Sequence, residues 1–209
     1  MQIVKSNFNK ILYVAIILTA IIAGWGLSKI FSSSNTPNEI DTSFRLIDNT
    51  GQNLTNNDLK GKSKVIFFGF TNCPDVCPIS ADLMSASINK IKNEELSLNN
   101  IEFIFITTDP KRDTPERMTE FLSDYNPKII GLTGKYSNLK NVWKNFFVHV
   151  LPVNDDTQDH GDVGTPESHN YMVEHTAFYY LFDKKDRLSA ILPFGTSEEI
   201  LLTEIKKIL

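Results

Sequence analysis

The two cysteines of this 209-residue chain, Cys73 and Cys77, both lie in the segment FFGFTNCPDVCPIS, at the end of an apolar run. Each is followed by a proline. Four interpretations are open: a coincidental pair of buried thiols, a structural disulfide, a redox dithiol and a metal clamp. A disulfide that closes so short a loop removes little entropy from the unfolded chain, so stability alone is a weak reason for the pair.

The redox and metal interpretations use the same thiolates. Cys77 precedes Pro78, and we expect it to cap a helix whose positive end lowers the pKa of a nearby thiol. The spacing is one residue longer than in the Cys-x-x-Cys redox motif. Two soft sulfur ligands select Cu(I) or zinc, and a structural zinc site usually needs four protein ligands. With two cysteines in the chain, zinc would need two further ligands, whereas Cu(I) is satisfied by two or three.

The possible nitrogen ligands are four histidines: His149, His160, His169 and His175. The first lies in the alternating run FFVHVLP, where we expect a packed or edge residue. The second and third lie in an acidic polar stretch, Asn154 to Glu174, which we predict to be a long loop with solvated side chains. The fourth directly precedes the apolar run Ala177 to Asp183, a predicted strand.

The position of His175 decides between the interpretations. If the strand Ala177 to Asp183 runs antiparallel beside the strand Lys64 to Phe70, its start meets the end that carries Cys73 and Cys77. An imidazole there would complete a Cys2His copper site. The alternative is a loop histidine with a structural partner.

The elements that must position these residues follow from hydrophobic periodicity and turn signals. We predict a hairpin over 42–54, strands over 64–70, 101–109, 128–134, 177–183 and 188–194, and helices over 78–92, 113–125, 136–146 and 197–209. This order indicates an α/β sandwich with a mixed sheet. Function in such sheets lies beyond the carboxyl ends of parallel strands, which is where both cysteines fall.

A membrane anchor is predicted ahead of this domain. Ile11 to Ser28 carries no charge, and as a helix its 18 residues span roughly 27 Å, close to the hydrocarbon thickness of about 30 Å. We expect a transmembrane helix over 11–30, a cytoplasmic N-terminus over 1–10 and a linker over 31–41. A cleaved signal peptide is the alternative, although its apolar region is usually shorter and no A-x-A site follows here.

Charge indicates the orientation and restricts the partners. Lys5 and Lys10 precede the span and Lys29 follows it, which favours an exported main domain over 42–209. A bacterial inner membrane with this domain in the oxidising periplasm fits best. The net charge is −4, and residues after the first thirty hold 18 basic against 25 acidic side chains, or −7. An acidic domain argues against nucleic acid or anionic lipid as its partner.

Three sequence blocks resemble the SCO/SenC family of copper-binding proteins: GFTNCPDVCP, TTDPKRDTPERMTEFL and EHTAFYYLFD. The resemblance covers roughly Thr42 to Leu209 and implies a thioredoxin-like fold. It places one copper ion per chain on Cys73, Cys77 and His175. Glu174 stands where the family usually has aspartate. Asp109 and Pro110 of the middle block are expected to support the site rather than to bind metal.

The resemblance also implies a role in assembly of cytochrome c oxidase, with delivery of copper to the binuclear site of subunit II and possible exchange with other copper carriers. It therefore favours a metallochaperone over an enzyme. The alternative is a periplasmic thiol–disulfide oxidoreductase or peroxidase that uses the pair Cys73 and Cys77, in which one cysteine attacks and the other resolves. Both roles are compatible with one dithiol.

Overall fold

The computed structural model describes Thr19, residues 40–154 and residues 171–209. The chain divides into the units Met1–Glu39 and Ile40–Leu209. The predicted anchor (11–30) and most of the predicted linker lie outside the described residues, apart from Thr19. Among the described residues, none of the helices has both the length and the apolar character needed to cross a membrane.

A seven-stranded mixed sheet organises the second unit. Its strand order is β2-β1-β5-β4-β3-β8-β9. The three central strands are parallel, and β8 pairs antiparallel with β3, which is the arrangement on which the copper-site interpretation of His175 depended. The strands are β1 (Arg45–Asp48), β2 (Asn53–Thr55), β3 (Ser63–Gly69), β4 (Ile101–Thr107), β5 (Ile129–Thr133), β8 (Phe178–Phe182) and β9 (Leu188–Pro193).

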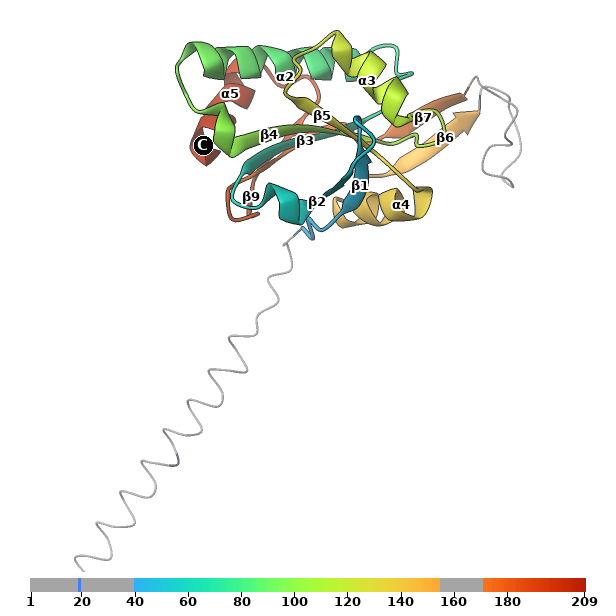
Figure 1. Cartoon of the computed structure of the whole chain (residues 1–209), viewed down its shortest axis with the longest axis horizontal. Coiled ribbons are helices and arrows are strands. Elements are labelled where there is room, and N and C mark those ends of the chain that lie inside the picture. The colour runs from blue at the N-terminus through green and yellow to red at the C-terminus, as the bar shows by residue number, and fades with distance from the viewer. Residues whose placement is uncertain (1–18, 20–39, 155–170) are drawn as a thin grey trace, which may run out of the picture. The chain divides into compact units, whose positions relative to one another are not determined.

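Helices cover both faces of this sheet (Figure 1). The helices are α2 (Val76–Asn93), α3 (Pro115–Ser123), α4 (Tyr136–Asn145) and α5 (Glu198–Ile208), with short 3-10 turns η1 (Asn56–Leu59) and η2 (Leu98–Asn100). Alternating side chains of β3 divide between two cores because successive residues of a strand point to opposite faces. Val65 and Phe67 pack with α2, α3 and α5, whereas Ile66 and Phe68 pack with α4.

Local signals fix where these helices begin. The Thr114 side chain accepts a hydrogen bond from the Arg117 amide, and the Ser197 side chain accepts one from the Ile200 amide, so these two residues cap their helices. The predicted α/β sandwich with a mixed sheet is confirmed.

The prediction of a loop from Asn154 to Glu174 is wrong at both ends. β7 (Tyr171–His175) pairs antiparallel with β6 (Val150–Asn154) in a separate two-stranded sheet, so Asn154 and Tyr171–Glu174 are strand residues. The alternation of YMVEH carries the signal: Val173 is buried, whereas Met172 and Glu174 are exposed. The apolar residues of this run that point inward are Tyr171 and Val173, and their neighbours in the sequence are mostly polar. Without knowledge of the partner strand, this pattern is weak evidence for a strand.

Candidate functional site

Cys73 lies between the carboxyl end of β3 and the start of α2, and Cys77 lies in the first turn of α2. The helix begins at Val76 with Asp75 at its N-cap, so the prediction that Cys77 caps the helix is wrong. A proline needs no backbone hydrogen bond anywhere in the first turn, so Pro78 tolerates a helix that starts two residues earlier. Cys77 therefore lies within the first turn and is fully buried, and Cys73 is partly exposed ahead of the helix.

His175 reaches the dithiol because β8 runs antiparallel to β3. Phe67 pairs with Tyr179, so the end of β3 lies opposite the residues that precede β8. The Nε2 atom of His175 is 3.9 Å from the Sγ atom of Cys77. In zinc sites, metal–sulfur bonds of about 2.3 Å and metal–nitrogen bonds of about 2.0 Å place the two ligand atoms about 3.5 to 4 Å apart. This pair therefore has the separation of two ligands of one ion.

The other ring nitrogen sets the tautomer of His175. Its Nδ1 atom is 3.1 Å from the carbonyl oxygen of Thr176. A carbonyl only accepts hydrogen bonds, so Nδ1 carries the proton and Nε2 presents its lone pair towards Cys77. Burial lowers the pKa of His175, which keeps the ring neutral. These are the conditions that a metal-binding imidazole needs.

The two thiols are electrostatically unequal. The hydrogen bond with the Cys77 side chain, helped by the amides of Asp75 and Cys77, lowers the pKa of Cys73 to about 5 despite partial burial. The same hydrogen bond and then burial raise the pKa of Cys77. At neutral pH, Cys73 is therefore the thiolate and Cys77 the thiol, the reverse of the order expected from a Cys77 cap.

The three predicted ligands are only partly assembled. The Cys73 Sγ atom accepts a hydrogen bond of 3.4 Å from the backbone amide of Cys77. Within residues 40–154 and 171–209, no three histidine, cysteine, aspartate or glutamate side chains already converge around one metal position. Both thiols are free. Joint ligation by all three residues therefore requires their side chains to converge further than they do here.

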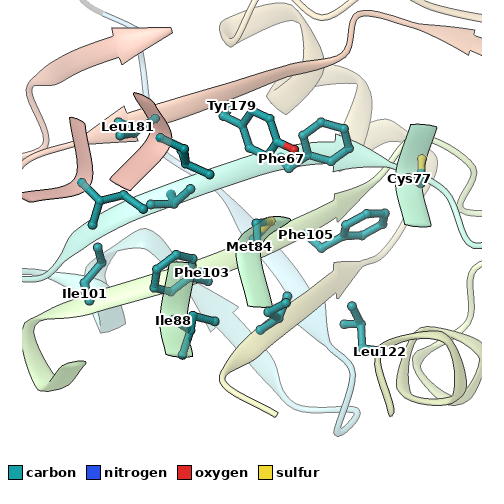
Figure 2. Packing of buried hydrophobic residues seen from close by; sticks show 14 of the residues in the cluster. Phe67, Cys77, Met84, Ile88, Ile101, Phe103, Phe105, Leu122, Tyr179 and Leu181 are labelled. Carbon is teal, nitrogen blue, oxygen red and sulfur yellow. The ribbon is translucent and has the colours of Figure 1, made fainter. Parts of the chain in front are cut away.

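Gly69, the last residue of β3, leaves the space that the Cys77 sulfur occupies. A Cβ atom at this position would lie 2.7 Å from Cys77 Sγ and 2.7 Å from the Phe105 ring. The Phe70 amide donates a hydrogen bond of 3.4 Å to the same sulfur. Figure 2 shows Cys77 at one end of the apolar cluster that contains Phe67 and Phe105. The missing side chain of Gly69 thus lets the thiol approach the strand.

Replacing Gly69 by alanine is expected to displace Cys77. Overpacking of this kind lowers the free energy of unfolding by roughly 1–3 kcal/mol, and the shifted thiol should react faster with iodoacetamide in the folded protein. Gly131→Ala is the matched control, because its Cβ would lie 2.8 Å from Leu122 Cδ1, away from the thiols. If Cys77 in Gly69→Ala is labelled at the same rate as in the wild-type chain, the claim that Gly69 makes room for this thiol is contradicted.

A buried carboxylate holds the loop between β3 and the first cysteine. Asp113 accepts hydrogen bonds from the Thr71 hydroxyl and the Thr107 hydroxyl, both at 2.6 Å, and from the Thr71 amide. Its side chain is fully buried, and burial raises its pKa to about 6. From the sequence block TTDPKRDTPERMTEFL we singled out Asp109 and missed Asp113. The order of residues along the chain does not show that Thr71 and Thr107 come together around Asp113.

The remaining candidates lie apart from the thiols or are not described. His149 is exposed just before β6, where its amide donates to the Thr176 hydroxyl at 3.1 Å. His160 and His169 fall outside the described residues. Asp109 is buried and pairs with Arg112 and with the Tyr171 hydroxyl, which agrees with a supporting position.

Comparison with known proteins identifies the family to which the chain is similar. The SCO1/SenC family model matches residues 32–209. Protein sco1 of Schizosaccharomyces pombe is 38% identical over 179 residues, which are 85% of this chain and 63% of that relative. An SCO2-like protein of Rickettsia prowazekii is 37% identical over 201 residues, 88% of each chain. The copper-bound structure of Bradyrhizobium japonicum ScoI is 31% identical, with a TM-score of 0.68 over 80% of this chain and 98% of that chain.

Fold and site together define a thioredoxin-like α/β domain with a dithiol at the carboxyl end of a central strand and a histidine facing it. The chain belongs to the SCO1/SenC family, since the family model covers most of its length.

Proposed function

We propose that this protein is a membrane-anchored copper chaperone that carries one copper ion on Cys73, Cys77 and His175. The observation that carries the proposal is the approach of His175 Nε2 to Cys77 Sγ at 3.9 Å, across two segments 98 residues apart. Two thiolates and one neutral imidazole are a soft donor set suited to Cu(I). The copper-bound ScoI structure supports the same cargo.

The two thiols differ in exposure and in pKa, and this difference is the basis for how we expect copper to bind and to be released. Cys73 is partly exposed and holds a thiolate at neutral pH, so it offers the first accessible ligand. Cys77 is buried beside His175 and must lose a proton before it can bind. A three-ligand site leaves one side of the ion open, so a thiol of the receiving protein can displace a ligand.

The receiving protein proposed here is subunit II of cytochrome c oxidase, at its binuclear copper site. Membership of the SCO1/SenC family supports this partner and also exchange with other copper carriers.

We further propose that residues 11–30 anchor the chain once in the bacterial inner membrane and that the main domain works in the periplasm. The uncharged segment Ile11 to Ser28 and the preceding lysines support this placement.

A second candidate is a thiol–disulfide oxidoreductase. The observation that favours it is the same pair of unequal thiols, because an accessible thiolate beside a buried thiol suits attack and resolution. In that reaction, the Cys73 thiolate would attack a partner disulfide to form a mixed disulfide, which Cys77 would then resolve. This role does not need His175.

Anaerobic titration of the reduced full-length chain with Cu(I), against a chromogenic chelator, tests the main proposal. We expect one copper per chain and loss of binding in both Cys73→Ser and Cys77→Ser. Affinity should also fall as the pH falls, because protons compete for the thiolates. A wild-type chain that binds no copper while its thiols cycle through a disulfide would leave the oxidoreductase alone.

A further inference from the structure

The strand that carries His175 is not part of the main sheet. Within the described chain, β7 pairs only with β6, in the separate two-stranded sheet. The hydrogen bonds between His149 and Thr176 join the start of β6 to the end of β7 at one end of this ribbon, so they do not tie it to β3 or α2. The pairing of β8 with β3 brings the end of β7 close to the thiols, and side chains that link β7 to the body of the domain then hold His175 in place.

Arg112, which follows β4, makes the most extensive link. Its Nη1 atom donates a hydrogen bond of 2.8 Å to the Tyr171 carbonyl oxygen, and its guanidinium carbon lies 3.8 Å from the centre of the Tyr171 ring. The Tyr171 hydroxyl donates to Asp109 at 2.5 Å, and Asp109 also pairs with Arg112 Nε. Tyr171 is thus held by its backbone, its ring face and its hydroxyl.

The alternation of side chains along β7 links the contacts of Arg112 with Tyr171 to the position of His175. Tyr171, Val173 and His175 alternate with the exposed Met172 and Glu174, so the first three share the inward face. Arg112 holds the first of them, the apolar core holds the second, and the third lies at the thiols.

A second path runs through Phe70. The Arg112 guanidinium lies 5.8 Å from the Phe70 ring centre, and the Phe70 ring meets the His175 ring edge-on with 5.8 Å between centres. Phe70 also donates its amide to the Cys77 sulfur. The Phe70 ring therefore lies close to both the Arg112 guanidinium and the His175 imidazole, while the backbone amide of the same residue bonds the buried thiol.

Arg112 is held here at a cost. Its Nη2 atom is buried, and no acceptor for it is present in the part of the chain that the structure describes. A buried unpaired donor typically costs about 1–3 kcal/mol. Such groups are rare in folded proteins, and a role in the site is one explanation for this one.

We propose that Arg112 is a positioning residue, which clamps Tyr171 and Phe70 so that His175 is presented to the dithiol. This proposal deepens the copper function proposed above. A lysine at this position would keep a positive charge near Asp109 but could neither stack on two rings nor reach the Tyr171 carbonyl with the same fork.

Hydrogen exchange of the copper-free, full-length chain tests the clamp directly. In Arg112→Lys, we expect amides of 171–175 to exchange about tenfold faster or more, with β3 and β8 unchanged. Tyr171→Phe keeps the ring and should show a smaller effect. Arg117→Lys is the matched control, because Arg117 pairs with Glu120 on the exposed face of α3. Unchanged exchange in 171–175, or equally faster exchange throughout the domain, would overturn the proposal.

The Cu(I) titration gives the second readout. Loss of an outer-shell contact commonly weakens metal binding 10- to 100-fold, and we expect that range for Arg112→Lys and no change for Arg117→Lys. A local rise in exchange with unchanged copper affinity would overturn the link to the ligand. Failure of the wild-type chain to bind copper would instead refute the proposed function, and the exchange data would still decide the role of the clamp.

Discussion

His175→Ala is expected to weaken copper binding by at least about 100-fold, the upper end of the loss seen when only an outer-shell partner is removed. The physical reason is the removal of the neutral nitrogen ligand that lies 3.9 Å from Cys77. The dithiol itself should remain competent, so disulfide formation between Cys73 and Cys77 should proceed at a similar rate. Chelator competition gives the affinity, and thiol labelling gives the redox state.

His149→Ala is the matched control for this variant. It removes an exposed imidazole from the same ribbon and leaves the ligand set intact, so copper affinity should not change. If His175→Ala binds copper as tightly as the wild-type chain, the three-ligand site is refuted. Copper binding would then rest on the two thiols without His175.

Asp113 is expected to make the fold less stable as the pH rises from about 4 to about 6. Its pKa is raised by burial to about 6 in the folded chain, from 3.8 without the fold, so the folded state holds the extra proton between these values. The stabilisation is fully present below the lower value and lost above the higher one. At 1.36 kcal/mol per unit, the change amounts to about 3 kcal/mol.

Denaturant unfolding of wild type and Asp113→Asn at several pH values measures this effect. The difference in the free energy of unfolding, wild type minus variant, should fall as the pH rises through this window. Asp41→Asn is the control with the opposite sign, because hydrogen bonds with Ser43 lower the pKa of Asp41. A carbon-13 NMR titration of the wild-type Asp113 carboxyl group gives the same pKa independently, and a value near 4 would contradict the prediction.

Much of the fold could be predicted because its signals are local. The apolar runs of β3 and β4 are buried at every position, as continuous hydrophobic strands should be. Thr114 and Ser197 cap their helices through bonds to residues three positions away. The signal failed where strand formation depended on a distant partner: Tyr171–His175 becomes a strand only against Val150–Asn154.

The candidate site divides in the same way. The residue types and the spacing of Cys73 and Cys77 already limited the chemistry to soft metal binding or thiol exchange. The start of α2 was misplaced by two residues, and that shift exchanged the roles of the two thiols, because hydrogen bonds and burial at the helix start decide which one ionises.

By itself, the sequence determined which residues are available: two thiols near a helix start, a histidine before a strand, and a sheet to carry them. Such features are set by neighbours along the chain. Only the tertiary structure decided that Nε2 of His175 faces Cys77, that Gly69 makes room for the sulfur, and that Asp113 and Arg112 support the site from the segment after β4. Apart from the contact between Gly69 and Cys77, these contacts join residues tens of positions apart, and they exist only when parallel and antiparallel strand pairing brings the segments together.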